Sequence, residues 1–283
     1  MTDSYAKNEA GIRLPSFYFL GVDPAPARLS TADDGALAIL KATPRPGIPE
    51  PTGNISDWLC QFIWAFVLRK ATARQWSSFI HVKHRHFGFS GICMDPGGGG
   101  NEINNELILT KQNINGVETT VTPIASLEDQ ERTGPNAQFI LTMFRRRDPG
   151  IQQLWPHLAG DDNLVEAMHN AFHEAVAYQI ISWPKPFNNR PIAETSAWHE
   201  EKQWALKNMD AARDKQLPAI QVATNGDGSF ALTGHGAKRF ECAGRKDIAY
   251  AHIYAYVRFM VWLKMGELEY AGEDGGGEYF TTL

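Results

Sequence analysis

The chain has 283 residues, of which 43% are hydrophobic, and it contains 8 Trp and 15 Phe. This is enough apolar material for a sizeable core, and the length allows one large domain or two small ones. The formal net charge of −5 argues weakly against a general nucleic-acid-binding protein, because such domains are often basic. No stretch reaches the roughly 18 to 20 consecutive apolar residues that cross a bilayer, so we expect no membrane partner.

Cysteine usage and the two ends of the chain suggest a cytosolic protein with one main domain. The three cysteines are too few and too widely spaced for a disulfide framework or a zinc motif, which favours a reducing compartment. Residues 1–15 are polar, lack the apolar core of a signal peptide, and are interpreted as a leader. Residues 269–283 are predicted to form a flexible glycine-rich tail. We expect residues 16–268 to form a single domain.

Short apolar runs open the predicted domain. Residues 16–22 are apolar and aromatic and stop at Asp23-Pro24, which predicts a buried strand ended by proline. Residues 36–40 are predicted to pair with this strand in the antiparallel direction. A long helix is predicted from Asp57 to about Lys70, with aromatic residues on its apolar side. A second helix is predicted from Thr72 to about His86.

The middle of the chain begins with another apolar run. Residues 89–94 predict a core strand that stops at Asp95-Pro96 and is followed by four consecutive glycines. Residues 101–110 are expected to be helical. Residues 117–125 are rich in β-branched side chains and predict a strand. The apolar residues 137–144 fit either a strand or a helix.

The last third is predicted to be mainly helical. Residues 162–181 and 196–214 have helical spacing of their apolar side chains. Residues 220–232 flank an Asn-Gly-Asp-Gly turn and predict a hairpin. Asp247 is placed to begin a long helix that continues to about Leu263. The mixture of strands and helices predicts an α/β domain with a central mixed sheet flanked by helices.

Three aspartates lie at predicted ends of secondary structure. Asp23 and Asp95 each end a buried strand, and Asp247 begins a helix. Carboxylates delivered from rigid elements can converge, and such oxygen ligands suit Mg²⁺ and Mn²⁺. A pair of these ions roughly 3.5–4 Å apart can activate water and stabilise the leaving oxygen during phosphodiester hydrolysis. Each aspartate taken alone also fits a purely structural role as a strand end, a turn or a helix cap.

The segments around these aspartates resemble, in the same order, the nuclease motifs of the large terminases of tailed bacteriophages. The first is Phe17-Tyr-Phe-Leu-Gly-Val-Asp23-Pro-Ala, with Asp33-Asp34 shortly before Ala36-Leu-Ala-Ile. The second is Gly91-Ile-Cys-Met-Asp95-Pro-Gly-Gly-Gly-Gly-Asn-Glu, and the third is Gly244-Arg-Lys-Asp247-Ile-Ala-Tyr-Ala-His-Ile-Tyr-Ala. The resemblance covers roughly residues 16–265, and it is carried by the ordered triplet more than by any single motif.

The resemblance implies a ribonuclease H-like fold in which Asp23, Asp95 and Asp247 are catalytic and bind two divalent cations, Mg²⁺ or Mn²⁺. It also implies that Asp34, or its neighbour Asp33, is an accessory metal ligand. The implied activity is endonuclease cleavage of double-stranded DNA during viral genome packaging, in the cytoplasm of the infected bacterial host. The implied partners are the terminase ATPase motor, the small terminase subunit and the portal. A P-loop is absent, so we expect the chain by itself to cut DNA but not to pump it.

Several basic residues are candidates for binding DNA through its phosphates. Lys246, next to Asp247, could steady the scissile phosphate or lower the pKa of an acid, or it could simply face solvent. Phosphate contacts of this kind give affinity without sequence readout. The other candidates, each of which also fits a solvated surface position, are Arg245, Arg145, Arg146, Arg147 and Arg85.

Alternative functions stay open from the sequence. A ribonuclease H or a junction resolvase would share the fold, and a non-catalytic adaptor docking on a packaging motor would keep the fold without the chemistry. His169 and His173 are four residues apart on a predicted helix and could bind zinc, although the glutamate of an HExxH motif is missing between them. No nucleophile elbow and no GxGxxG dinucleotide motif is present, which argues against those enzyme classes.

Overall fold

The structure is a computed structural model, and it describes residues 16–25, 34–48, 51, 53–95, 99–124, 162–184, 197–232, 238–242 and 244–272. Several features predicted from the sequence lie outside these residues, namely the leader, Asp33, the apolar run 137–144, the three arginines Arg145, Arg146 and Arg147, and most of the tail. The domain boundaries therefore stay predictions. No helix among the described residues is long and apolar enough to cross a membrane.

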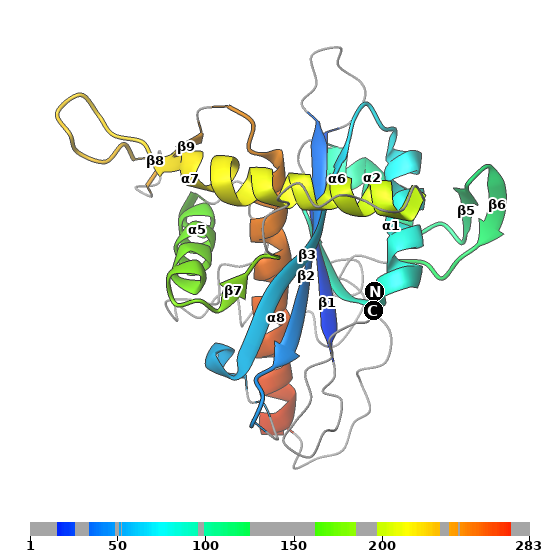
Figure 1. The fold of residues 1–283 in the computed structure, drawn as a ribbon, viewed down its shortest axis with the longest axis horizontal. Coiled ribbons are helices and arrows are strands. Elements are labelled where there is room, and N and C mark those ends of the chain that lie inside the picture. The colour runs from blue at the N-terminus through cyan, green and yellow to red at the C-terminus, as the bar shows by residue number, and fades with distance from the viewer. Residues whose placement is uncertain are drawn as a thin grey trace.

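A five-stranded mixed sheet forms the centre of the described fold (Figure 1). The strand order is β4-β1-β2-β3-β7, where β1 is Phe17–Asp23, β2 is Gly35–Pro44, β3 is Trp58–Leu68, β4 is Phe89–Met94 and β7 is Ile181–Ser182. The first three strands are successively antiparallel, whereas β4 is parallel to β1 and β7 is parallel to β3. The predicted α/β class with a central mixed sheet is confirmed, as are the strands expected at 16–22, 36–40 and 89–94.

The helix predicted from Asp57 to Lys70 is wrong, because this segment forms β3 after a single 3-10 turn, η1 (Ile55–Asp57). Its aromatic side chains are typical of strands. From Trp58 to Phe62 the burial alternates, with Trp58, Cys60 and Phe62 in one core and Leu59 and Gln61 exposed. That two-residue period belongs to a strand, and pairing with β2 satisfies the backbone groups on one side of β3.

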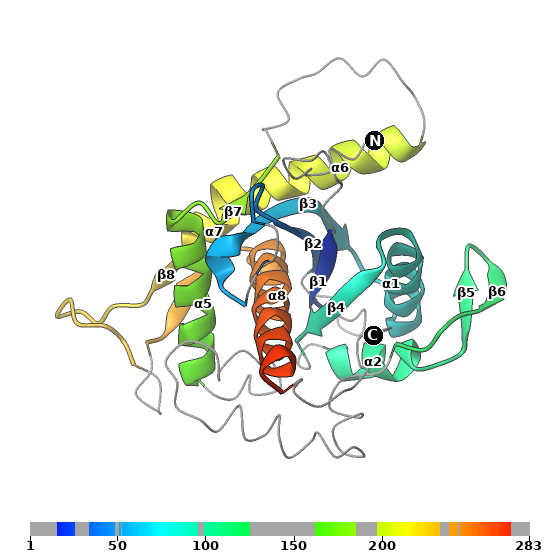
Figure 2. The ribbon, with the colours of Figure 1, turned by 90° about the horizontal axis from the view of Figure 1, so that it is seen from below.

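Helices cover both faces of the sheet (Figure 2). One core lies between the strands and α8 (Asp247–Gly272) with α5 (Asp162–Ala177), and the other lies between the strands and α1 (Ala73–Phe87) with α2 (Gly100–Leu107). Helix α6 (Ala197–Ala211) packs along β3 and contributes to both cores. The helices predicted near Thr72, 101–110, 162–181 and 196–214 are confirmed with small shifts at their ends.

Helix α8 is the central helix, and its residues from Ile248 to Leu263 are buried on almost every side. It packs directly on β1 at Gly21, where an added Cβ would lie 1.9 Å from the carbonyl oxygen of Ala251 and 2.3 Å from the nitrogen of Ala255. Further along, the rings of Phe259 and Trp262 pack on Phe19 near the start of β1. The helix therefore runs antiparallel to β1 and begins over its C-terminal end, and the predicted start at Asp247 is confirmed.

Two small hairpins project from opposite sides of the body (Figures 1 and 2). One is β5 (Lys111–Ile114) with β6 (Val117–Thr120), which confirms the first part of the strand predicted at 117–125. The other is β8 (Ile220–Val222) with β9 (Phe240–Cys242), and β8 follows the short helix α7 (Leu217–Ala219). The turn predicted after Thr224 is present, since Thr224 bridges Phe230, but β8 itself pairs with β9.

Replacing Gly21 with Ala tests the packing of α8 on β1. The new methyl group would overlap backbone atoms of α8, which cannot avoid the clash by changing rotamer as a side chain could. We therefore expect the free energy of unfolding to fall by about 3 kcal/mol. Gly226→Ala is the matched control, because a Cβ there meets no atom within 4 Å. Urea unfolding of both variants measures the difference. Equal stabilities would show that α8 does not rest on Gly21.

Candidate functional site

Parallel pairing of β1 with β4 places Asp23 and Asp95 side by side. Val22 lies opposite Met94, and the amide of Asp95 donates to the carbonyl of Val22 at 3.2 Å, so the ladder continues to the two aspartates. Neighbouring strands are about 4.8 Å apart. Gly21 and Gly91 both face α8, and residues at even spacing share a face, so Asp23 and Asp95 lie on the α8 side of the sheet. Both are half-buried.

Asp247 reaches the same end of the sheet from α8. The helix crosses Gly21 at Ala251, and the four residues back to Asp247 span about 6 Å along the helix axis. The two residues from Gly21 forward to Asp23 span about 7 Å in the same direction. All three predicted acids therefore gather where β1 and β4 finish and α8 begins, a place called here the Asp23 end of the sheet.

The residues at this end have the right chemistry to bind a divalent cation, but their side chains are not close enough together to form the site. Carboxylate oxygens are the ligands that Mg²⁺ and Mn²⁺ prefer, and Asp23 and Asp95 are already adjacent. Within the described parts of the chain, however, no three His, Cys, Asp or Glu side chains are grouped closely enough to hold a metal ion. The side chains of the three acids would have to come closer together to complete a three-ligand site.

The start of α8 is held by Gln216, a residue that the sequence analysis missed. Its side-chain oxygen accepts hydrogen bonds from the backbone amides of Ile248 and Ala249 at 3.0 and 3.1 Å. These amides belong to the first turn, whose N–H groups have no partner within the helix. Because Gln216 is distant in sequence and is not a usual N-cap residue, no local pattern around Asp247 indicates it.

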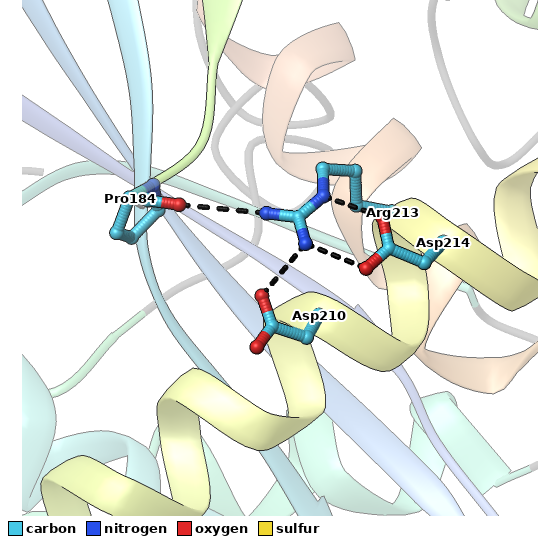
Figure 3. Close-up of polar contacts among 4 residues, drawn as sticks. All are labelled: Pro184, Asp210, Arg213 and Asp214. Carbon is cyan, nitrogen blue, oxygen red and sulfur yellow. Dashed lines mark hydrogen bonds and ion pairs between the residues drawn. The ribbon is translucent and has the colours of Figure 1, made fainter. Parts of the chain in front are cut away.

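A π-helix (η4, Ala212–Gln216) presents Gln216 to α8, and Arg213 holds this π-helix in place. Its guanidinium donates to Asp214 at 2.6 Å, to Asp210 at 2.9 Å and to the carbonyl of Pro184 at 3.4 Å (Figure 3). These contacts join the end of α6 to the segment after β7. The position of the α8 start, and with it of Asp247, therefore depends on residues far away along the chain.

Two tyrosines of α8 lie near Asp23 and Asp95 and were also missed. Tyr250 and Tyr254 follow Asp247 at helical spacing, on one side of the helix. Burial raises the pKa of Tyr250 to about 12, and the charges of Asp23, Cys242 and Asp95 act in the same direction. Burial, followed by Asp23 and Asp95, also raises the pKa of Tyr254. Both phenols therefore stay protonated at neutral pH and can donate hydrogen bonds near the acids.

Lys246 and His169 complete the surroundings of Tyr250. The ammonium group of Lys246 lies 4.9 Å from the centre of the Tyr250 ring, and the Tyr250 hydroxyl is 3.4 Å from Nε2 of His169. Burial, the neighbouring His173 and Lys246 lower the pKa of His169 to about 4, so this imidazole is neutral at pH 7. The rings of His169 and His173 are 6.4 Å apart, and the described residues offer no third ligand, so the zinc hypothesis gains no support.

Asp34 lies at the Asp23 end but makes ion pairs there. It precedes β2, in which Ala36 lies opposite Asp23 and Gly35 opposite Leu68. One oxygen of its carboxylate, Oδ2, lies 3.1 Å from Nε of Arg69 and also pairs with Nη1 of Arg245. The expected role as an accessory metal ligand stays a prediction, and the contacts shown are with two guanidinium groups.

The candidate DNA-binding residues are only partly brought together. Arg245 and Lys246 lie in the loop just before α8, next to the acids. Arg85 lies in the last turn of α1, before β4 begins, and is separated from Asp95 by the length of β4, about 20 Å. Its neighbour Lys83 is not a solvated residue, because it is buried and pairs with Glu201.

The stability of the fold is expected to depend on pH through two buried histidines. Burial lowers the pKa of His252 to about 4, as it does for His169, from a value of 6.5. Between about pH 6.5 and 4 the unfolded chain binds protons that the folded chain does not. Each histidine thus contributes stability that is present above pH 6.5 and is lost as the pH falls, with a slope of up to about 1.4 kcal/mol per pH unit.

His252→Gln should reduce the slope of the free energy of unfolding against pH, because glutamine does not ionise. The reduction should correspond to up to one proton fewer taken up on unfolding. Urea unfolding between pH 7.5 and 5 measures the slope for the variant and for the unmodified chain. The comparison uses slopes, since a glutamine buried against Phe62 changes the stability at every pH. An unchanged slope would show that His252 is not excluded from protonation in the folded state.

Comparison with known proteins gives a distant structural resemblance. No protein-family model matches the sequence, and no curated protein matches it. Among solved structures, the chain is similar to the magnesium-bound large terminase nuclease from the thermophilic phage G20c. The sequences are 13% identical, the match covers 89% of this chain and 85% of that one, and the TM-score is 0.39. Values this low do not establish a shared fold or family, so function has to be argued from the residues of this chain.

Proposed function

We propose that the chain is a divalent-metal-dependent endonuclease of the ribonuclease H-like type that hydrolyses phosphodiester bonds in double-stranded DNA. The single observation that carries this proposal is the parallel pairing of β1 with β4, which sets Asp23 beside Asp95 on the face covered by α8. Asp247 begins that helix at the same end. The proposal is supported by the fact that two strand ends and a helix start at one end of the sheet each carry an aspartate, since metal-assisted phosphodiester hydrolysis uses cations that prefer carboxylate oxygens.

In this proposal Asp23, Asp95 and Asp247 hold the cations, which when bound supply an activated water and offset charge on the scissile phosphate. The other residues of the site position the acids and the DNA phosphate. Gln216 fixes the start of α8, and Tyr250 is protonated and can donate a hydrogen bond beside the acids. Lys246 is exposed over Tyr250 and can contact a phosphate. No side chain is needed as a general base.

We further propose the biological setting implied by the sequence motifs. The nuclease would act during viral genome packaging in the cytoplasm of an infected bacterium, with an ATPase motor, a small terminase subunit and the portal as partners. Other nuclease roles on the same fold, such as junction resolution or cleavage of RNA in hybrids, would use the same acids. Cleavage of branched and hybrid substrates beside linear duplex separates these roles.

A non-catalytic adaptor is the second candidate. It is favoured by one observation, namely that no three potential ligands in the described part of the chain are grouped as a metal site. Such a protein would keep the sheet and α8 while binding no cation at the Asp23 end. Metal binding and DNA cleavage therefore decide between the two proposals.

The deciding experiment is plasmid digestion by the purified chain in EDTA, in Mg²⁺ and in Mn²⁺. We expect cleavage that requires metal and that falls to the EDTA background in Asp23→Asn, Asp95→Asn and Asp247→Asn, because each change removes an anionic ligand. The control is Glu118→Gln, which removes an exposed carboxylate from β6. Thermal unfolding checks that every variant is folded. Metal-dependent cutting by all three aspartate variants would contradict the assigned ligands, and a folded but inactive chain would favour the adaptor.

A further inference from the structure

Two arginines from distant segments share one carboxylate oxygen. Arg69 follows β3, and Arg245 precedes α8, yet both pair with Oδ2 of Asp34. The Asp34 side chain is only 13% exposed, whereas those of Arg69 and Arg245 are 73% and 61% exposed. Asp34 therefore lies beneath two cations that face solvent, and the group of three carries one net positive charge.

The local backbone presents both arginines at this place. The chain turns directly after Arg69, where Lys70 has a φ of 49°, a value that is uncommon for residues with a side chain. Gly244 has a φ of 119°, which lets the chain turn just before Arg245. Cys242 contacts the carbonyl of Arg245 at 3.8 Å and steadies that loop. Backbone turns on both sides thus direct the two guanidinium groups to one point.

The position of this group relates it to the acids. Gly35 lies opposite Leu68 and Ala36 opposite Asp23, so Asp34 and Arg69 lie at the Asp23 end of the sheet. Arg245 is two residues before Asp247. A DNA strand that presents a phosphate to Asp23, Asp95 and Asp247 would therefore pass Arg69 and Arg245 with the same or a neighbouring phosphate.

Phosphate is a better partner for this pair than a single carboxylate oxygen. Two guanidinium groups close together repel each other unless an anion lies between them. Guanidinium groups bind the non-bridging oxygens of phosphate with two parallel hydrogen bonds, a geometry that one shared oxygen does not satisfy. Exposed ion pairs of this kind add little to stability, so a role in folding alone gives a weak account of the arrangement.

We propose that Arg69 and Arg245 form a phosphate-binding pair for the DNA backbone, and that the Asp34 carboxylate occupies this pair when DNA is absent. The proposal rests on the proposed nuclease function for the source of the phosphate. It gives Asp34 the role of a competing anion that restrains DNA binding, in place of the role of a metal ligand. It also adds Arg69, which the sequence analysis did not assign to the site.

The test is DNA binding in EDTA, where no cleavage occurs. Fluorescence anisotropy of a labelled duplex across a range of KCl concentrations gives the affinity and its salt dependence. We expect Arg69→Ala to weaken binding several-fold and to reduce the slope of log K against log salt by about one. Arg69→Lys should restore the slope but only part of the affinity. Lys111→Ala is the control, since it also removes an exposed, ion-paired cation but from β5.

Asp34→Asn separates the two roles of Asp34. If Asp34 acts as a competing anion, this substitution frees the arginines. DNA binding should then become several-fold tighter and more salt-dependent, while metal-dependent cleavage persists. If Asp34 acts as a metal ligand, the substitution would leave DNA binding in EDTA unchanged and abolish cleavage. That result would overturn the proposal. Thermal unfolding checks the fold of this variant, and the Arg69 variants carry the test if it is unstable.

The remaining outcomes are also decisive. Equal affinities of Arg69→Ala and Lys111→Ala would overturn the phosphate pair, as would a folded chain that does not bind the duplex. Displacement of the duplex by inorganic phosphate at the same concentration of phosphate groups would assign the pair to a small phosphate compound instead of DNA. Cleavage in Mg²⁺ is measured separately, so failure of the phosphate pair is distinguishable from failure of the nuclease proposal.

Discussion

The contact between α8 and Gly21 of β1 is the constraint on which the rest of the described structure depends. With no side chain at position 21, the backbone of the helix at Ala251 and Ala255 lies directly on the strand. This close approach fixes the position of the helix along β1 and the side of the helix that faces β4. Asp247, Tyr250 and Tyr254 consequently lie at the end of the sheet that carries Asp23 and Asp95, and a larger residue at position 21 would displace all three at once.

Charged side chains from distant segments lie together at the Asp23 end of the sheet. This end carries four carboxylates, two guanidinium groups and the ammonium group of Lys246; the acids are Asp23, Asp34, Asp95 and Asp247. A buried or half-buried cluster of acids is unfavourable without cations nearby. The two arginines offset the charge of Asp34 in the structure, and a bound metal ion would add positive charge beside the other three acids.

The strand β3 shows why sequence patterns failed for one large element. The residues from Trp58 to Leu68 are nearly all apolar, and such a run fits a buried helix as well as a buried strand. The alternation of exposure from Trp58 to Gln61 is visible only when one face has solvent and the other has a core. Pairing with β2, which is itself buried on both faces, decided the outcome. By contrast, β1, β4 and the start of α8 have clear signals in the sequence and were predicted correctly, whereas α8 continues to Gly272, beyond its predicted end near Leu263.

The sequence by itself determined that Asp23, Asp95 and Asp247 stand at the ends of two strands and at the start of a helix, because proline, glycine and helix-start signals are local. Only the tertiary structure decided that these ends meet, since the parallel register of β1 and β4 joins residues that are far apart in the chain. The same is true of the carboxylate of Asp34, which pairs with Arg69 and Arg245, and of Gln216, which holds the start of α8. Those contacts depend on how distant segments pack, and no local pattern encodes them.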